Sequence, residues 1–337
     1  MSVNTTDFAR MVTGFLTDYL PLQRGYSKNT ILSYRDALKL FIVFLTEEKE
    51  IQLSKFTMSG FTRILVVEFL EWCRAKGASV STANQRLAAL KSFASYAQIE
   101  RIDYMAPLQD VQGIRSRRTE GKEIAFLSVE QMTLLINQPD VNTRCGLRHR
   151  TALTLLYDSG CRVQELCDIR LCDVNTGNNP TVKLHGKGDK YRTVVISDST
   201  GSLLKEYISR QRNGALQNQP LIVNRTGRKL SRDGVQYMID KYVREIQAEN
   251  KAFPDHVHCH QFRHSKAMHM LAAGINIVYI RDFLGHEDIS TTQVYSRADN
   301  RLKNEAINAL APKLVAETGL PDWRADQDLL GFLNSFR

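Results

Sequence analysis

The sequence predicts a mainly α-helical protein with a small β-sheet, divided into two domains. Apolar residues recur at helical spacing through most of the 337 residues, and strand-like segments are confined to residues 181–223. A basic, turn-rich segment at about 107–123 interrupts the helical pattern, and a chain of this length commonly forms two domains. We therefore expect a helical domain over 1–111, a basic linker over 112–123, an α+β domain over 124–321 and a tail helix over 322–337.

Four amphipathic helices with short connections are predicted in the first domain, as in a helical bundle. The first spans 6–20 and ends before Pro21, Ser27 caps the second, the third covers about 59–74, and the fourth follows Ser81. The outer faces of the second and fourth carry side chains suited to phosphate contact and base-edge readout, namely Lys28, Arg35, Lys39, Asn84, Gln85, Arg86 and Lys91. An ordinary solvated helix face is the alternative explanation.

Composition narrows the class of partner. The formal net charge is +9 and the sequence pI is about 9.2, which favours a polyanionic partner without identifying one. The chain contains no run of 18 apolar residues, so the sequence predicts no membrane span. The first ten residues do not resemble a signal peptide. The six cysteines form no CxxC pair, so we expect reduced thiols in a cytoplasmic protein.

After the first domain, the sequence predicts a basic linker and a second domain of helices and short strands. Arg115, Arg117 and Arg118 make the linker basic, so it could track a phosphate backbone or simply be exposed. Ser128 is expected to cap a helix, and further helices are predicted at about 147–159, 163–169, 200–212, 231–249, 260–273, 276–283 and 290–297. Strands are predicted at 181–185, 191–196 and 221–223, with a hairpin turn at 186–189.

The stretch 260–295 concentrates chemically active side chains. It begins with His260, Arg263 and His264 and ends with His286 and Tyr295. Guanidinium groups bind phosphate oxygens, and a deprotonated phenol is a nucleophile, so the set suits a phosphodiester. Zinc is the alternative, because His260 and His264 are four residues apart. A zinc hydrolase would carry glutamate after the first histidine, where this chain has Gln261, so no metal is expected.

Five motifs then occur in a characteristic order: SGCRVQEL, HGKGDKYR, HQFRH, LGH and TTQVY. In this order the chain resembles a tyrosine recombinase of the phage integrase family. The resemblance covers nearly the whole chain, with the helical domain similar to the core-binding domain and residues from about 124 similar to the catalytic domain. The N-terminal helices resemble most those of transposon-associated members.

The resemblance implies a role for each matching residue. Arg162 and Arg263 would clamp the phosphate, Lys187 would be the general acid, and His260 and His286 would complete the site around the nucleophile Tyr295. Glu165 and His264 would support them. Phe262 stands where leucine is common, and Ser296 and Arg297 follow the tyrosine where histidine is often found. No cofactor is implied, because a 3′-phosphotyrosine would conserve the bond energy.

The partner implied is double-stranded DNA at specific recombination sites. A chain that is monomeric in solution would assemble as a homotetramer on two sites. Leu329, Phe332, Leu333 and Phe336 fall on one face of the tail helix, which could dock on its own domain or on a neighbour. Two other functions remain open: a type IB topoisomerase and a sequence-specific DNA-binding protein without catalysis.

Overall fold

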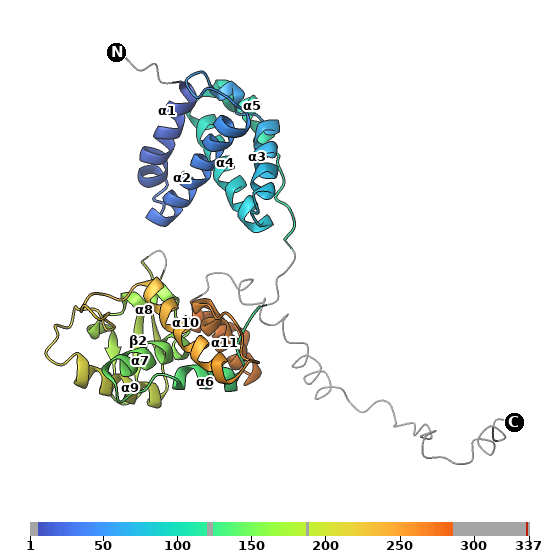
Figure 1. The fold of residues 1–337 in the computed structure, drawn as a ribbon. Coiled ribbons are helices and arrows are strands. Elements are labelled where there is room, and N and C mark those ends of the chain that lie inside the picture. Colours follow the sequence, from blue (N-terminus) through green and yellow to red (C-terminus); the bar gives the residue numbers. More distant parts are fainter. Residues whose placement is uncertain (1–5, 120–123, 187–188, 286–334, 336–337) are drawn as a thin grey trace. The chain divides into compact units, whose positions relative to one another are not determined.

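The computed structural model describes residues 6–119, 124–186, 189–285 and 335. The chain divides into two compact units, 1–122 and 123–337, and each is described separately. Figure 1 shows the first unit as helices alone and the second as helices with a small sheet. The predicted fold class, mainly α with a small β-sheet, is confirmed.

The first unit is built from helices with polar caps. Its α-helices are α1 (Asp7–Gly14), α2 (Lys28–Val43), α3 (Arg63–Ala75), α4 (Val80–Glu100) and α5 (Met105–Gln112). Wider π-helical turns extend α1 over Phe15–Gln23 and α2 over Phe44–Glu48, and 3-10 turns occupy Met58–Gly60 and Ile102–Tyr104. The predicted cap Ser27 is confirmed, since its hydroxyl accepts from the amide of Thr30 at 3.3 Å.

Three sequence predictions in this unit are wrong in detail. Pro21 lies inside the extension of α1 and not beyond its end, because the π-helical winding continues to Gln23. The fourth helix begins at Val80, before Ser81, and Ser79 caps it, with Ser79 Oγ accepting from Thr82 at 3.1 Å. The helical pattern also continues past Pro107. This proline stands in the first turn of α5, where a missing amide hydrogen costs no helical bond.

The core of the first unit is aromatic. Phe93 is fully buried and packs edge-on against Phe8, Phe15 and Phe61, with ring centroids 5.3–5.7 Å apart. Rings in this geometry gain electrostatic energy beyond the burial of their area. The cluster therefore fixes the helices of this unit by packing.

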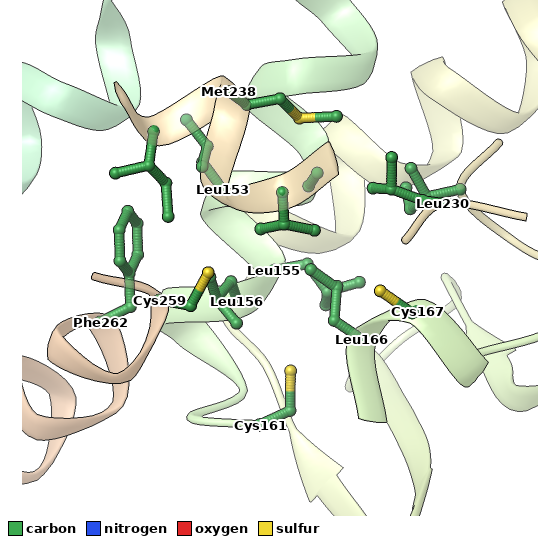
Figure 2. Packing of buried hydrophobic residues seen from close by; sticks show 14 of the residues in the cluster. Leu153, Leu155, Leu156, Cys161, Leu166, Cys167, Leu230, Met238, Cys259 and Phe262 are labelled. Carbon is green, nitrogen blue, oxygen red and sulfur yellow. The ribbon is translucent and has the colours of Figure 1, made fainter. Parts of the chain in front are cut away.

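The second unit surrounds helix α7. Its helices are α6 (Val129–Asn137), α7 (Arg144–Asp158), α8 (Val163–Asp168), α9 (Asp198–Gln211), α10 (Arg232–Glu249), α11 (Cys259–Ala272) and α12 (Ile277–Leu284), with a 3-10 turn at Leu171–Asp173. Helix α7 contacts α6, α8, α9, α10 and α11. Figure 2 shows leucines of α7 among Leu166, Met238 and Phe262 in the core. The predicted cap Ser128 is confirmed, with its hydroxyl accepting from Gln131 at 3.2 Å.

The sheet is antiparallel, with the order β1 (Val174–Asn175), β2 (Thr181–His185) and β3 (Tyr191–Val195). The predicted hairpin between β2 and β3 is confirmed, and Gly186 donates to the carbonyl of Lys190 at 2.8 Å to close it. The predicted strand 221–223 is wrong. Leu221 and Ile222 are buried, but the segment forms only an isolated bridge between Val223 and Lys229. Burial, rather than strand pairing, explains its apolar run.

Among the described helices, none combines the length and apolar character that a membrane span requires.

Candidate active site

A tight turn between α7 and α8 presents Arg162. The hydroxyl of Ser159 donates to the carbonyl of Leu155 at 2.6 Å, and Gly160 takes a left-handed conformation with φ +57°. A side chain at Gly160 would meet Phe283 at 2.9 Å, so glycine is required by space as well as by backbone geometry. The turn leaves Arg162 just before the first residue of α8, with its side chain 37% exposed.

Glu165 is the buried anion of this site. Its side chain is only 4% exposed. One carboxylate oxygen accepts from the backbone amide of Arg162 at 2.8 Å, and the other accepts from the Arg162 guanidinium at 2.9 Å. These bonds hold the Arg162 side chain against the start of α8.

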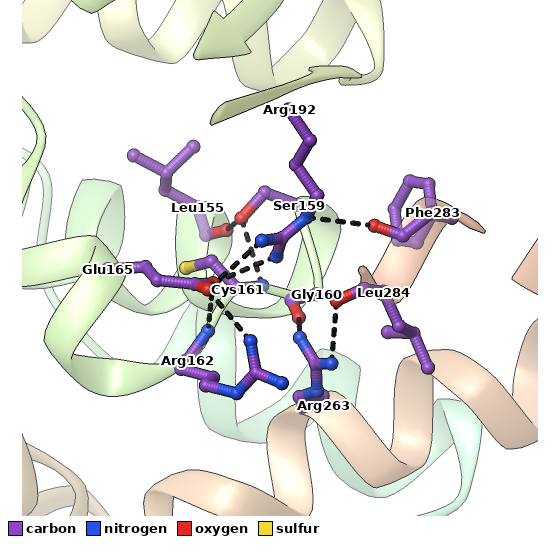
Figure 3. Close-up of polar contacts among 10 residues, drawn as sticks. All are labelled: Leu155, Ser159, Gly160, Cys161, Arg162, Glu165, Arg192, Arg263, Phe283 and Leu284. Carbon is purple, nitrogen blue, oxygen red and sulfur yellow. Dashed lines mark hydrogen bonds and ion pairs between the residues drawn. The ribbon is translucent and has the colours of Figure 1, made fainter. Parts of the chain in front are cut away.

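Arg192 on β3 is the second partner of Glu165. Its two terminal nitrogens donate to both carboxylate oxygens at 3.0 and 2.8 Å, and its Nε donates to the carbonyl of Phe283 at 3.2 Å. Burial alone would raise the pKa of Glu165, but the bonds from Arg192 and the Arg162 amide hold that pKa below its usual value. Glu165 is therefore ionised at neutral pH. Figure 3 shows this carboxylate between the two arginines.

Arg263 reaches the same turn from α11. Its terminal nitrogens donate to the carbonyls of Gly160 and Leu284, both at 2.7 Å, and the residue is 3% exposed. Carbonyl oxygens are neutral acceptors, so these bonds orient the guanidinium without cancelling its charge. Figure 3 shows Arg263 below Gly160, beside Arg162. The HQFRH and SGCR motifs are thus joined directly.

The end of α12 completes the junction of motifs. Gly285 ends this helix in a left-handed conformation with φ +66°. A Cβ there would lie 2.9 Å from Cδ and 3.2 Å from Cζ of Arg192. The glycine of the LGH motif therefore lets Arg192 pass close to the backbone that leads to residue 286.

His260 and His264 lie one turn apart on α11, with ring centroids 6.3 Å apart. His260 is exposed as a residue, yet desolvation of its ring and the charges of Arg263 and Arg162 lower its pKa. Desolvation, His260 and Arg263 lower the pKa of His264 as well. Both imidazoles are therefore neutral near pH 7, and a neutral imidazole can accept a proton.

Nearby side chains are structural. The ring of His269 receives a hydrogen bond from the Tyr157 hydroxyl at 2.8 Å and donates to the Leu127 carbonyl at 3.0 Å, so both ring nitrogens have partners within the fold. Cys161 and Cys167 are buried, and burial raises the pKa of their thiols to about 12 and about 11. Among the described residues no three His, Cys, Asp or Glu side chains gather as metal ligands.

The predicted site residues divide into two groups. The structure brings together Arg162, Glu165, His260, Arg263 and His264 from two separate motifs. Lys187, His286, Tyr295, the helix predicted at 290–297 and the tail at 322–337 lie outside the described residues. Sequence reasoning missed Arg192. Its signal is the alternation of β3, in which Arg192 and Val194 are the less exposed residues, so a charge there requires a buried partner.

The predicted DNA-facing residues of the first unit differ in their contacts. Lys28, Arg35, Lys39 and Gln85 are exposed, whereas Asn84, Arg86 and Lys91 are half-buried. Asn84 both donates to and accepts from the backbone of Arg117, at 2.8 and 3.0 Å, which pins the linker to α4. Arg117 also pairs with Glu71, while Arg115 and Arg118 are exposed. For Asn84 and Arg117, part of the polar capacity is used within the chain.

Sequence comparison identifies this arrangement. Residues 125–301, more than half of the chain, match the phage integrase family, and residues 13–101 match the phage integrase N-terminal SAM-like domain. The chain belongs to the phage integrase family. The prediction that the chain is a tyrosine recombinase is confirmed. The prediction that it is a DNA strand-transferring enzyme is confirmed as well. A topoisomerase or a non-catalytic protein is not favoured.

Individual relatives agree with this family. The tyrosine recombinase XerC of Thermodesulfovibrio yellowstonii is 31% identical and covers 86% of this chain and 91% of its own. The tyrosine recombinase XerD of Staphylococcus haemolyticus is 31% identical, with 88% and 96% covered. The Tn1549 transposon integrase, solved with transposon right end DNA, shares the fold with a TM-score of 0.66 at 18% identity, covering 88% of this chain and 99% of that one.

Proposed function

We propose that this recombinase cuts and rejoins DNA at specific sites through a 3′-phosphotyrosine, moving a mobile element by integration, excision or transposition. The observation that carries the proposal is the Gly160 carbonyl accepting from Arg263 at 2.7 Å, two residues before Arg162. Two guanidinium groups from distant motifs therefore flank one turn. Such a pair suits the developing charge on the non-bridging oxygens of a phosphodiester.

The proposed reaction begins with attack of the Tyr295 oxygen on phosphorus. The bond from phosphorus to the 5′-oxygen breaks, and the 3′-phosphate is left on the tyrosine. A phenol has an unperturbed pKa of about 10, so it must lose its proton to a base near neutral pH. His260 is the acceptor we propose, because its lowered pKa keeps the imidazole neutral. Lys187 protonates the departing 5′-oxygen, and His286 donates to the phosphate.

Rejoining reverses these steps with the 5′-hydroxyl of a partner strand. The number of phosphodiester bonds is unchanged, so the cycle consumes no ATP and we expect cleavage to persist in EDTA. Water would hydrolyse the intermediate, so the site must exclude it until the partner strand arrives. Loss of cleavage in EDTA, restored by zinc or magnesium, would contradict this mechanism.

The domain plan that we propose gives each part a task. Residues 1–111 bind the core site, 112–123 link the domains along the DNA, 124–321 catalyse, and 322–337 contact a neighbouring protomer. Four protomers on two double-stranded sites, in the bacterial cytoplasm, would perform strand exchange. Deleting 322–337 should spare single-site binding and abolish the four-protomer complex in native gels. A truncated protein that still forms this complex and recombines would contradict the proposed tail contact.

A Tyr295→Phe variant tests the proposed function. The site would first be selected by the wild-type protein from a random duplex pool and then built as a nicked suicide substrate. The wild-type chain should form a covalent adduct that survives a denaturing gel, while Tyr295→Phe should bind equally and form none. An adduct with Tyr295→Phe would assign the nucleophile elsewhere. Relaxation of supercoiled plasmid without recombination would favour a topoisomerase.

A further inference from the structure

We propose that Arg192 is a positioning residue that neutralises Glu165 and thereby leaves the charge of Arg162 available to the scissile phosphate. The inference rests on the proposed function and assigns a role to a side chain outside the set of catalytic residues. Its basis is the three-residue cluster of Arg162, Glu165 and Arg192, with a net charge of +1.

The geometry separates the two arginines by function. Arg192 makes a two-pronged ion pair with Glu165, and its side chain is 16% exposed. Arg162 donates one side-chain bond to the same carboxylate, and its side chain is 37% exposed. The less exposed arginine, Arg192, thus makes the stronger contact with the anion, and the more exposed Arg162 makes the weaker one.

Removing Arg192 would change the charge balance around Arg162. Glu165 would remain a buried carboxylate. Within this cluster, Arg162 would be the cation that still donates to it. Desolvation makes that carboxylate a strong acceptor, so the Arg162 guanidinium would be drawn into the two-pronged geometry now held by Arg192. The cluster would then have no net charge, and Arg162 would stabilise the transition state less.

Arg192 also fixes the spacing of three chain segments. It stands on β3, bonds Glu165 on α8, and donates to Phe283 near the end of α12. A Cβ on Gly186, at the end of β2, would lie 3.5 Å from a Glu165 carboxylate oxygen and 3.7 Å from Arg192. The hairpin, the Arg162 turn and the C-terminal end of α12 are therefore held by one guanidinium.

An Arg192→Gln variant tests the charge role on the selected suicide substrate. Cleavage at saturating DNA should fall about 10- to 100-fold, less than the loss expected for a donor that contacts the phosphate directly. DNA affinity should change little. Arg192→Lys keeps the charge and should lie between Gln and wild type. Arg210→Gln, which removes an exposed cation paired with Glu206, should cleave as wild type.

A substrate with a methylphosphonate at the scissile position supplies the deciding readout. This group lacks one non-bridging charge, so it needs less neutralisation by Arg162. The ratio of wild-type to Arg192→Gln cleavage rates should shrink at least several-fold on it. An unchanged ratio would mean that Arg192 only supports the fold and would overturn the inference. Equal cleavage of the ordinary substrate by both proteins would overturn it too. A wild-type chain that forms no adduct would instead refute the proposed function, and the inference with it.

Discussion

The two units differ in the residues that fill their interiors. The first is held by phenylalanine rings, and every side chain identified as both buried and polar or charged among the described residues belongs to the second. These are His149, Thr151, Asp158, Ser159, Glu165, Thr200, Arg263 and Ser265. Apolar packing needs no specific partner, whereas each buried polar group must be hydrogen-bonded. The first interior therefore provides rigidity, and the second also fixes the orientation of charged groups.

Asp158 shows how the second unit meets that demand. Its carboxylate accepts from Lys266 at 2.9 Å and from the amide and hydroxyl of Ser197 at 2.7 and 2.9 Å. Burial favours a raised pKa, but Lys266 and these donors hold the pKa of Asp158 below its usual value. The ion pair ties α7 to α11, which carries Arg263. The buried polar contacts of Asp158 thus help to position the helix that carries Arg263.

The largest effect should follow from removing the buried cation. Arg263→Ala should lower suicide-substrate cleavage by about 1,000-fold, because it removes a guanidinium that we place at the phosphate. Site affinity, measured by gel shift, should fall only a few-fold. Arg263→Lys is the matched control, since it keeps a charge but cannot bridge the Gly160 and Leu284 carbonyls in the same way. Cleavage by Arg263→Ala within ten-fold of wild type would refute the assignment.

The second prediction concerns the aromatic interior. Phe93→Ala should destabilise the first unit by about 3–5 kcal/mol, because it removes a buried ring with three edge-on neighbours. Trp72 packs on Phe44 and Phe69, so its fluorescence in urea reports on this unit when Trp323→Phe removes the other tryptophan. Phe93→Leu should lose clearly less. A loss below about 1 kcal/mol for Phe93→Ala would mean that the cluster does not act as one core.

The elements that the sequence predicted correctly are those set by residues close together in the chain, such as the β2–β3 hairpin and the capped helix starts. The hairpin was predictable because alternation on both sides of the turn fixes the register, in which Lys183 pairs with Thr193. Caps such as Ser27 and Ser128 were predictable because a hydroxyl satisfies an amide three residues away. Strand β1 has two residues, too few for any periodicity.

The candidate site was predictable as a set of residues and not as a network. The motifs specify Arg162 and Arg263, but the Gly160 and Leu284 carbonyls that hold Arg263 carry no side-chain signature. The inward position of Arg192 signals a partner without specifying Glu165, 27 residues away. Asn84 has a side chain suited to base readout, and nothing in the sequence signals that it also bonds the Arg117 backbone. Tertiary contacts decide all three cases.

The third prediction is that acid lowers the stability of the second unit more than that of the first. All eight histidines follow residue 122. His149 is 5% exposed, with Nδ1 bonded to the Tyr242 hydroxyl at 2.9 Å and Nε2 facing the Arg148 guanidinium at 3.2 Å. Burial, followed by the charges of Arg148 and Lys241, lowers the pKa of His149 to about 4. The neutral ring is therefore the form that the fold accommodates.

The sign of this effect follows from proton binding. Between pH 6.5 and about 4 the unfolded chain binds a proton at His149 that the folded chain excludes, so stability is complete above pH 6.5 and falls toward pH 4. The loss reaches about 3 kcal/mol at most. Urea unfolding followed by circular dichroism should show it, while the Trp72 transition stays nearly constant. His149→Gln should flatten part of the slope. Equal acid sensitivity of both transitions would contradict the comparison.

The smallest effect should come from the exposed face of the first unit. Lys39 is exposed on α2, and we propose that it contacts a phosphate. Lys39→Gln should weaken site binding several-fold and reduce the slope of log affinity against log salt by about 1, because one fewer counterion is released. Cleavage at saturating DNA should be unchanged, since we propose that the first unit binds DNA and that the second carries out the reaction. Lys55, exposed and outside α2 and α4, gives the control Lys55→Gln, which should keep the wild-type slope. Equal slopes for Lys39→Gln and wild type would mean that this face is only solvated, and the DNA would then have to approach the first unit elsewhere.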